Sequence, residues 1–170
     1  MTFNKKLLAA TLLTVGGFAA ISSTNAATAT ATMGVQATVT ETCDVVAGSD
    51  INLGNIVAGA TGTTGETATA IKVNCSNLTP YNLGLSTSTG ADGTGVMLGG
   101  NDNAEKIPYN MFSDLSHTTA WGGTVGMNTV TGTGDGMLTP SQEHILYITA
   151  DATDVSKGIY EDTITVTVTY

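Results

Sequence analysis

The stretch ATATATMGVQATVTETC, residues 27–43, alternates strictly between apolar and non-apolar side chains from residue 29 to residue 39. Its apolar side holds Ala29, Ala31, Met33, Val35, Ala37 and Val39. Alternation with a period of two is typical of a β-strand that buries one face. At about 3.3 Å per residue the strand would be roughly 36 Å long, and its apolar face needs a partner to cover it.

The residues before this stretch have the pattern of a secretory signal peptide. Lys5 and Lys6 form a short basic region, residues 7–21 are apolar and small, and TNA at residues 24–26 resembles a cleavage site. The apolar run is short for a membrane span of about 20 residues. We therefore expect residues 1–26 to be removed on secretion, which leaves 144 of the 170 residues.

The remaining chain is acidic and rich in threonine and glycine. It holds three lysines, no arginine and 14 acidic residues, which argues against nucleic acids and anionic membranes as partners. Threonine-rich segments between glycine-rich turns predict one all-β domain, a sandwich or a barrel. STGADGTG at residues 88–95 and TGTGDG at residues 131–136 are expected to be loop tips.

Cys43 and Cys75 are the only cysteines. An even number of cysteines in an exported chain favours a disulfide. Cys43 continues the odd-numbered apolar phase of the first stretch, and Cys75 shares the phase of Ile71 and Val73, so both sulfurs should face the core. A free or metal-bound pair is the alternative.

A second long alternation, GIYEDTITVTVTY, occupies residues 158–170. One face carries Ile164, Val166, Val168 and Tyr170, and the other carries threonines. Shorter strand candidates lie at residues 51–56 (INLGNI), 69–75, 81–87, 107–112 and 144–150. The N-terminal stretch either pairs within its own chain or completes a neighbouring copy, and its small apolar side chains suit a preformed groove.

The order of several motifs resembles that of a known family. Residues 109–114 have the pattern YN-x-F-x-D, AWGG follows at residues 120–123, and residues 158–163 have the pattern G-x-Y-x-D-T. Together with INLGNI and the Cys75 strand, these motifs resemble the spore coat protein U-like family of secreted pilins. Members of that family are subunits of archaic chaperone–usher pili.

This resemblance implies an incomplete immunoglobulin-like β-sandwich that is completed by donor-strand exchange. Residues 27–40 would form the donor strand and residues 41–170 the pilin domain, although the unbroken alternation into Cys43 leaves that boundary open by several residues. The apolar side of residues 29–39 would enter the groove of another copy. The acceptor edge, first covered by a periplasmic chaperone, would be formed by Ile164, Val166, Val168 and Tyr170.

The same resemblance implies a non-enzymatic shaft subunit without a cofactor. Its expected partners are further pilin subunits, the chaperone and an outer-membrane usher, in a cell-surface pilus that supports adhesion and biofilm formation. The alternative function is a monomeric secreted β-sandwich that binds carbohydrate or calcium.

The remaining polar residues form no recognised catalytic or metal motif. His117 and His144 have no second ligand at a suitable spacing and are expected to be solvated. Asp114, Ser116 and His117 lie too close in sequence to form a catalytic triad. Asn74 and Asn77 begin glycosylation sequons that we interpret as accidental.

Two surface sites remain as alternatives. Loop oxygens could bind calcium without EF-hand spacing, through Asp92, Asn101, Asp102, Asn103 and Asp135. Trp121 is expected to pack at an edge, with carbohydrate stacking as the other possibility.

Overall fold

The computed structural model describes residues 27–59, 65–100, 102, 104–151 and 154–170. Within these residues the chain forms nine strands and no α-helix. The strands are β1 (Cys43–Val46), β2 (Gly65–Cys75), β3 (Pro80–Ser86), β4 (Thr94–Gly99), β5 (Glu105–Phe112), β6 (Val130–Thr133), β7 (Gln142–Ala150), β8 (Tyr160–Glu161) and β9 (Thr165–Thr169). No described segment is a helix long and apolar enough to cross a membrane. The predicted signal peptide, Asn101 and Asn103 lie outside the described residues.

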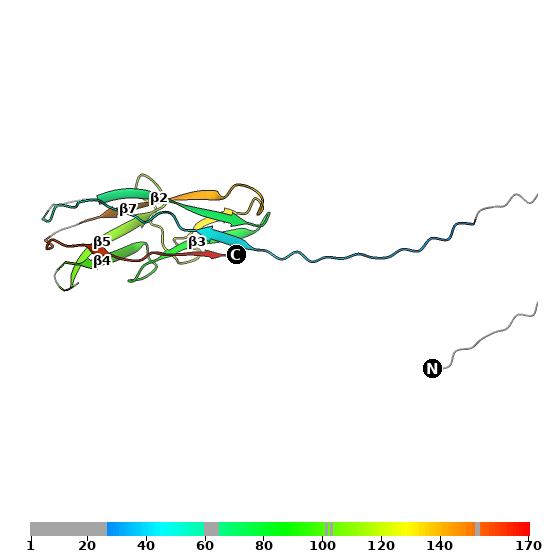
Figure 1. Ribbon diagram of the computed structural model, residues 1–170, viewed down its shortest axis with the longest axis horizontal. Helices are drawn as coiled ribbons and strands as arrows, with labels where there is room; N and C mark the ends of the chain where they lie inside the picture. The colour runs from blue at the N-terminus through cyan, green and yellow to red at the C-terminus, as the bar shows by residue number, and fades with distance from the viewer. Residues whose placement is uncertain (1–26, 60–64, 101, 103, 152–153) are drawn as a thin grey trace, which may run out of the picture. The chain divides into compact units, whose positions relative to one another are not determined.

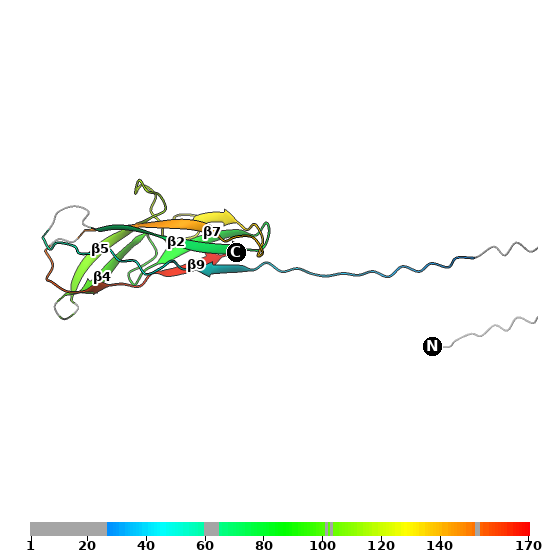
Figure 2. The ribbon, with the colours of Figure 1, turned by 45° about the horizontal axis from the view of Figure 1, so that its top comes forward.

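The strands form two sheets that pack face to face (Figures 1 and 2). One sheet has the order β1-β2-β7-β5-β4-β8 and the other the order β6-β3-β9. All neighbouring strands are antiparallel. The chain divides into two units after Ala37, and every strand belongs to the second unit, Thr38–Tyr170, called the domain below.

The core lies between the two sheets and takes alternate side chains from each. Ile71 and Val73 of β2 and Met111 of β5 face Leu83 and Leu85 of β3, and all are at most 1% exposed. Burial of each such side chain contributes about 1.5–3 kcal/mol. This packing confirms the predicted all-β sandwich.

The antiparallel register gives the domain two distinct ends. Cys43 pairs with Cys75 at one end, where β9 also finishes, because Thr169 pairs with Asn82 near the start of β3. We call this the disulfide end. At the opposite, far end β4 finishes at Gly99, which pairs with Tyr160 at the start of β8. Strand β9 therefore runs toward the disulfide end (Figure 1).

Most of the predicted strands are present, but the one at residues 51–56 is wrong. Asn52 Oδ1 accepts a hydrogen bond from Gly54 N at 2.8 Å, and Gly54 has a φ of +73°. An Asx turn with a left-handed glycine cannot continue a β-ladder. The predicted loop tips are also shorter than expected, since β4 begins at Thr94 and β6 includes residues 131–133.

Candidate functional site

Strand β9 is an edge strand with an incompletely covered apolar face. It pairs with β3 on one side, and no described strand pairs with its other edge. Ile164, Val166 and Val168 are only half-buried, whereas Leu83 and Leu85 on the neighbouring strand are fully buried. An open edge with unpaired backbone groups is a template for another strand. Tyr170 lies beyond the strand and is 55% exposed, so it does not share the half-buried face.

An open groove of about 780 Å³ lies beside β9, toward the far end. Its lining includes Ile51, Leu53, Ile71, Met97, Tyr109, Leu146, Ile148, Ile164 and Val166, and these residues come from both sheets and from the segment after β1. Polar side chains also line the groove, among them Asp50, Glu161 and Asp162, but the greater number of lining residues are apolar. The groove therefore offers apolar contacts to side chains and a free strand edge to a backbone.

The segment at residues 47–53 forms the groove wall opposite β9. It is held against β2 by close packing, because a Cβ on Gly48 would lie 2.1 Å from Thr69 Oγ1 and 2.7 Å from Ala70 O. Thr69 Oγ1 also donates a hydrogen bond to Ser49 O at 3.4 Å. This wall has no regular secondary structure, and no described strand pairs with the free edge of β9.

The two predicted motifs meet at the far end of the groove. Tyr109 Oη, from the YN-x-F-x-D motif, donates a hydrogen bond of 2.8 Å to Asp162 Oδ2, from the G-x-Y-x-D-T motif. Thr163 N donates to Asp162 Oδ1 at 2.8 Å. Burial raises the pKa of Asp162, but hydrogen bonds from Ser88, Thr163 and Tyr109 outweigh burial and hold its pKa below the ordinary value. Burial and the bond to Asp162 raise the pKa of Tyr109.

A second tyrosine–carboxylate contact secures β8 at the same end. Tyr160 Oη donates to Glu105 Oε2 at 2.7 Å, and Ser156 Oγ donates to Glu105 Oε1 at 2.6 Å. Hydrogen bonds from Ser156 and Tyr160 lower the pKa of Glu105. Both contacts hold the turn that leads into β9, so they fix one wall of the groove. Neither tyrosine–carboxylate contact was predicted, although Tyr109, Tyr160 and Asp162 lie in the two motifs.

The N-terminal segment, residues 27–40, carries the apolar side chains that were predicted to need a partner. It has no regular secondary structure, and its residues are exposed. Met33, Val35 and Val39 are 90%, 95% and 91% exposed. The predicted long strand is therefore absent from the single chain. Binding to a strand edge and a groove would stabilise this segment, because its apolar side chains would be removed from water.

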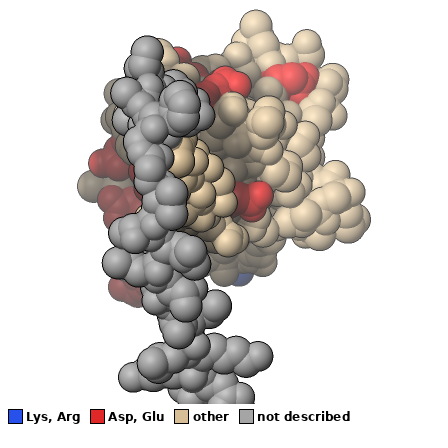
Figure 3. Space-filling model, turned by 90° about the vertical axis from the view of Figure 1, so that its right-hand side faces the viewer, with Lys and Arg blue, Asp and Glu red and all other residues tan. Residues whose placement is uncertain are grey.

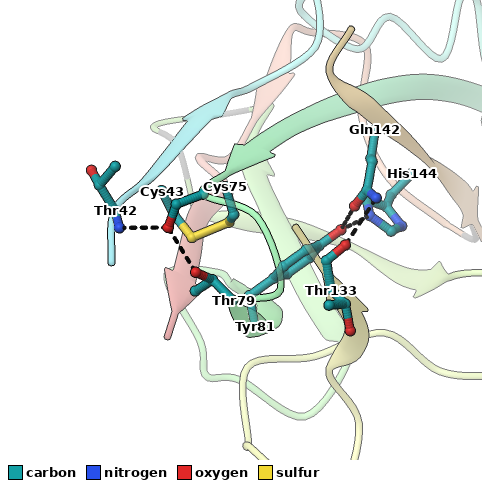
Figure 4. The surroundings of a disulfide bond; sticks show 9 residues. Thr42, Cys43, Cys75, Thr79, Tyr81, Thr133, Gln142 and His144 are labelled. Atoms are coloured by element: carbon teal, nitrogen blue, oxygen red, sulfur yellow. Dashed lines mark hydrogen bonds between the residues drawn. A yellow bond between two sulfur atoms is a disulfide. The ribbon is translucent and has the colours of Figure 1, made fainter. Parts of the chain in front are cut away.

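The predicted disulfide joins Cys43 to Cys75 (Figure 4). Cys75 is 2% exposed and Cys43 is half-buried, so both sulfurs contact the core as predicted. Next to the disulfide, Ser76 N donates to Thr42 O at 2.9 Å and Thr42 N donates to Ser76 Oγ at 3.1 Å. The start of β1 is thus joined to the end of β2 by a disulfide and by two flanking hydrogen bonds.

The other candidate residues have structural partners. His117 and His144 are half-buried, so the expectation that they are solvated is wrong. The His144 Nε2 lies 2.8 Å from Tyr81 Oη (Figure 4), and the His117 ring packs against the Phe112 ring at a centroid distance of 5.2 Å. Burial lowers the pKa of His144. Trp121 is fully buried, with Nε1 donating to Leu83 O at 2.9 Å, so the expected edge position is wrong and surface stacking is excluded.

Polar loop residues are engaged in local hydrogen bonds. Asp92 Oδ1 accepts from Thr94, and Asp135 Oδ2 accepts from Gln142 Nε2 at 2.6 Å. Asp114 accepts from the backbone of Thr118 and Thr119. Among the described residues, no three His, Cys, Asp or Glu side chains are placed to hold a metal ion.

Comparison with known proteins identifies the family. The model of the Spore Coat Protein U domain matches residues 29–167. The chain belongs to the Spore Coat Protein U domain family. The match begins inside the N-terminal segment, so this segment is part of the family pattern. Family membership confirms the expectation of a structural rather than an enzymatic protein.

A solved structure has a similar fold. The chain resembles one chain of the CsuC–CsuE chaperone–tip adhesion subunit pre-assembly complex from the archaic chaperone–usher Csu pili of Acinetobacter baumannii. The identity is 21% and the TM-score 0.53, over 78% of this chain and 40% of that chain. No curated protein sequence matches.

Proposed function

We propose that this Spore Coat Protein U domain protein is a structural subunit of an archaic chaperone–usher pilus. The observation that carries the proposal is that one chain holds both an open apolar groove beside an edge strand and an uncovered, alternating apolar segment. The segment of one copy fills the groove of the next. The family match and the likeness of the fold to a chain from a pilus complex support this assignment.

Strand addition gives both affinity and register. The backbone of residues 29–39 bonds to the free edge of β9, while its apolar side chains enter the groove between β9 and residues 47–53. A shift by one residue would turn the threonines inward, so the alternation specifies the register. The contact joins two different surfaces and does not close on itself, so repeated addition builds a fibre.

The same groove needs protection before assembly. A periplasmic chaperone covers the edge formed by Ile164, Val166 and Val168, with Tyr170 at its end, and an outer-membrane usher exports the subunit. The pilus on the cell surface then supports adhesion and biofilm formation. Because the subunit carries its own donor segment, residues 27–40, it belongs in the shaft.

The chaperone contact can be tested at the C-terminus. A tag appended after Tyr170 is expected to impair chaperone binding, because β9 is the edge on which the chaperone pairs and the terminal carboxylate is an anchor for basic side chains. The measurement is co-purification of the subunit with its chaperone. Unchanged co-purification would count against this role of β9.

Size-exclusion chromatography of the mature chain tests the proposed polymerisation. The wild-type chain is expected to form polymers, and Val35→Asp is expected to abolish them, because an aspartate in the groove buries a carboxylate at a cost of several kcal/mol. Thr38→Asp, on the opposite face of the segment, is the matched control and should still polymerise.

The rival function predicts a different chromatogram. A secreted β-sandwich that binds carbohydrate or calcium would elute as a stable, folded monomer both as wild type and as either variant. Polymers that were equally abundant with Val35→Asp would show that residues 27–40 are not the donor strand.

A further inference from the structure

Two leucines are exposed at the disulfide end of the domain. Leu78 is 76% and Leu138 103% exposed. Hydrogen bonds join their loops to each other and to β2. Leu78 N donates to Gly134 O at 2.8 Å, and Gly136 N donates to Cys75 O at 3.0 Å. Figure 3 views this end, where most of the visible described surface is uncharged and only scattered carboxylates and a small basic area appear. The two leucines thus lie on hydrogen-bonded loops at an end of the domain that carries little charge.

The chain leaves the domain at the same end. Thr42 is hydrogen-bonded to Ser76, which lies two residues before Leu78. Val39 lies four residues before Cys43. Four residues span at most about 14 Å. If Val39 lies in the groove of an acceptor copy, as the proposed function requires, the disulfide end of the donor copy is held within about that distance of the acceptor.

The direction of β9 decides which end of the acceptor the donor meets. A donor segment parallel to β9 would leave the groove at the acceptor's disulfide end, where the donor domain would compete for space with the acceptor's own segment. An antiparallel segment leaves at the far end and keeps the acceptor's own segment free. Continued assembly therefore places the donor's disulfide end against the acceptor's far end.

The far end carries an exposed apolar residue beside the groove. Ile159 is 79% exposed and directly precedes Tyr160, which lines the groove. The turn that contains Ile159 is held in place by the hydrogen bond from Tyr160 to Glu105. It also packs closely on Gly99, since a Cβ on that glycine would lie 2.0 Å from Ile159 O.

We propose that Leu78 and Leu138 of each copy pack against Ile159 of the copy that receives its N-terminal segment. This contact rests on the proposed function and adds a second interface between successive subunits, separate from the groove. It buries little area, but the inserted strand already holds the two copies together, so its formation is effectively intramolecular. The contact limits rotation between neighbouring subunits.

Site-specific photo-crosslinking of the polymerised full-length mature chain tests this contact. Benzoylphenylalanine is placed singly at Leu138, at Ile159, at Val35 and at Met127, which is 84% exposed in the loop between β5 and β6. The position at Leu138 should yield covalent dimers in which the linked peptide contains Ile159, and the position at Ile159 should link to residues 76–79 or 134–139. The position at Met127 should give little dimer.

The outcomes separate this inference from the proposed function. Dimers through Val35 without dimers through Leu138, or with Leu138 linked to another copy's disulfide end, would overturn the end-to-end contact and leave the groove contact intact. Loss of dimers through Val35 as well would overturn the proposed function and this inference together.

Discussion

At the scale of single residues, the far end of the groove depends on Tyr109 and Asp162. They are 53 residues apart in sequence, and their side chains join β5 to the turn before β9. Tyr109 is 3% exposed and lines the groove, so its ring supports the wall while its hydroxyl binds the carboxylate. This pair therefore determines where β9 begins relative to the core.

Removal of the Tyr109 hydroxyl should destabilise the domain. Tyr109→Phe keeps the ring and loses a hydrogen bond to a charged group, which costs about 1.5–3 kcal/mol. Tyr170→Phe is the matched control, since Tyr170 is 55% exposed beyond the end of β9, and it should leave the stability unchanged. The measurement is the unfolding free energy from urea denaturation. Equal stabilities of the two variants would show that the Tyr109–Asp162 bond contributes nothing.

The lowered pKa of Asp162 predicts sensitivity to acid. A carboxylate whose pKa is lower in the folded than in the unfolded state stabilises above its unfolded pKa, near 3.9, and this stabilisation is lost as the pH falls through the folded pKa. Asp162→Asn should therefore be less stable than wild type at pH 7, and the difference should shrink below about pH 4. Glu161→Gln, at the exposed neighbouring position, is the control. A constant difference between pH 7 and pH 3 in thermal unfolding would contradict this role.

At the scale of strands, the pattern of the sequence predicted best where one face is buried within the domain. The alternation at Ile164, Val166 and Val168 is present in β9, and β2, β5 and β7 contain their predicted segments. The segment at residues 51–56 begins with half-buried Ile51 and Leu53, but the alternation breaks after the turn at Asn52–Gly54, where a side-chain hydrogen bond replaces the ladder. Strand β4 was not among the predicted strands, and its first two residues belong to the predicted loop tip at residues 88–95. Yet Gly95 and Gly99 are buried where a Cβ would strike Tyr109 and Tyr160.

The groove itself could be predicted only in part. The C-terminal strand follows from alternation and from the family resemblance, and the donor residues stay a prediction. The opposite wall and the tyrosine–carboxylate pairs could not be predicted, since they depend on contacts between residues far apart in sequence.

The disulfide should matter most for β1. This strand has four residues and pairs only with β2 within the described sheet, so Cys43–Cys75 anchors it at its start. The double variant Cys43→Ala with Cys75→Ala is expected to lose about 2–4 kcal/mol of unfolding free energy, because the disulfide closes a long loop. Ser86→Ala, at the far end of β3, is a mild control. An unchanged midpoint in urea under oxidising conditions would rule out this contribution.

At the scale of the whole molecule, the described residues present two apolar surfaces, each without a strand partner. The groove beside β9 lacks a strand, and the apolar side of residues 29–39 lacks a sheet. In the proposed function the segment of one copy covers the groove of the next. Head-to-tail assembly would then repeat from copy to copy, because each copy carries both surfaces.

The most direct test moves the donor segment within one chain. Residues 27–40 are transferred from the N-terminus to follow Tyr170 after a short glycine-rich turn, so that they can return antiparallel along the free edge of β9. Thermal unfolding is then compared for this chain and for its Val35→Asp and Thr38→Asp versions. The proposal predicts a monomer whose midpoint falls by roughly 10 °C with Val35→Asp, from lost valine burial and a buried carboxylate, and by much less with Thr38→Asp. Equal midpoints for all three chains would contradict the claim that this segment fills the groove.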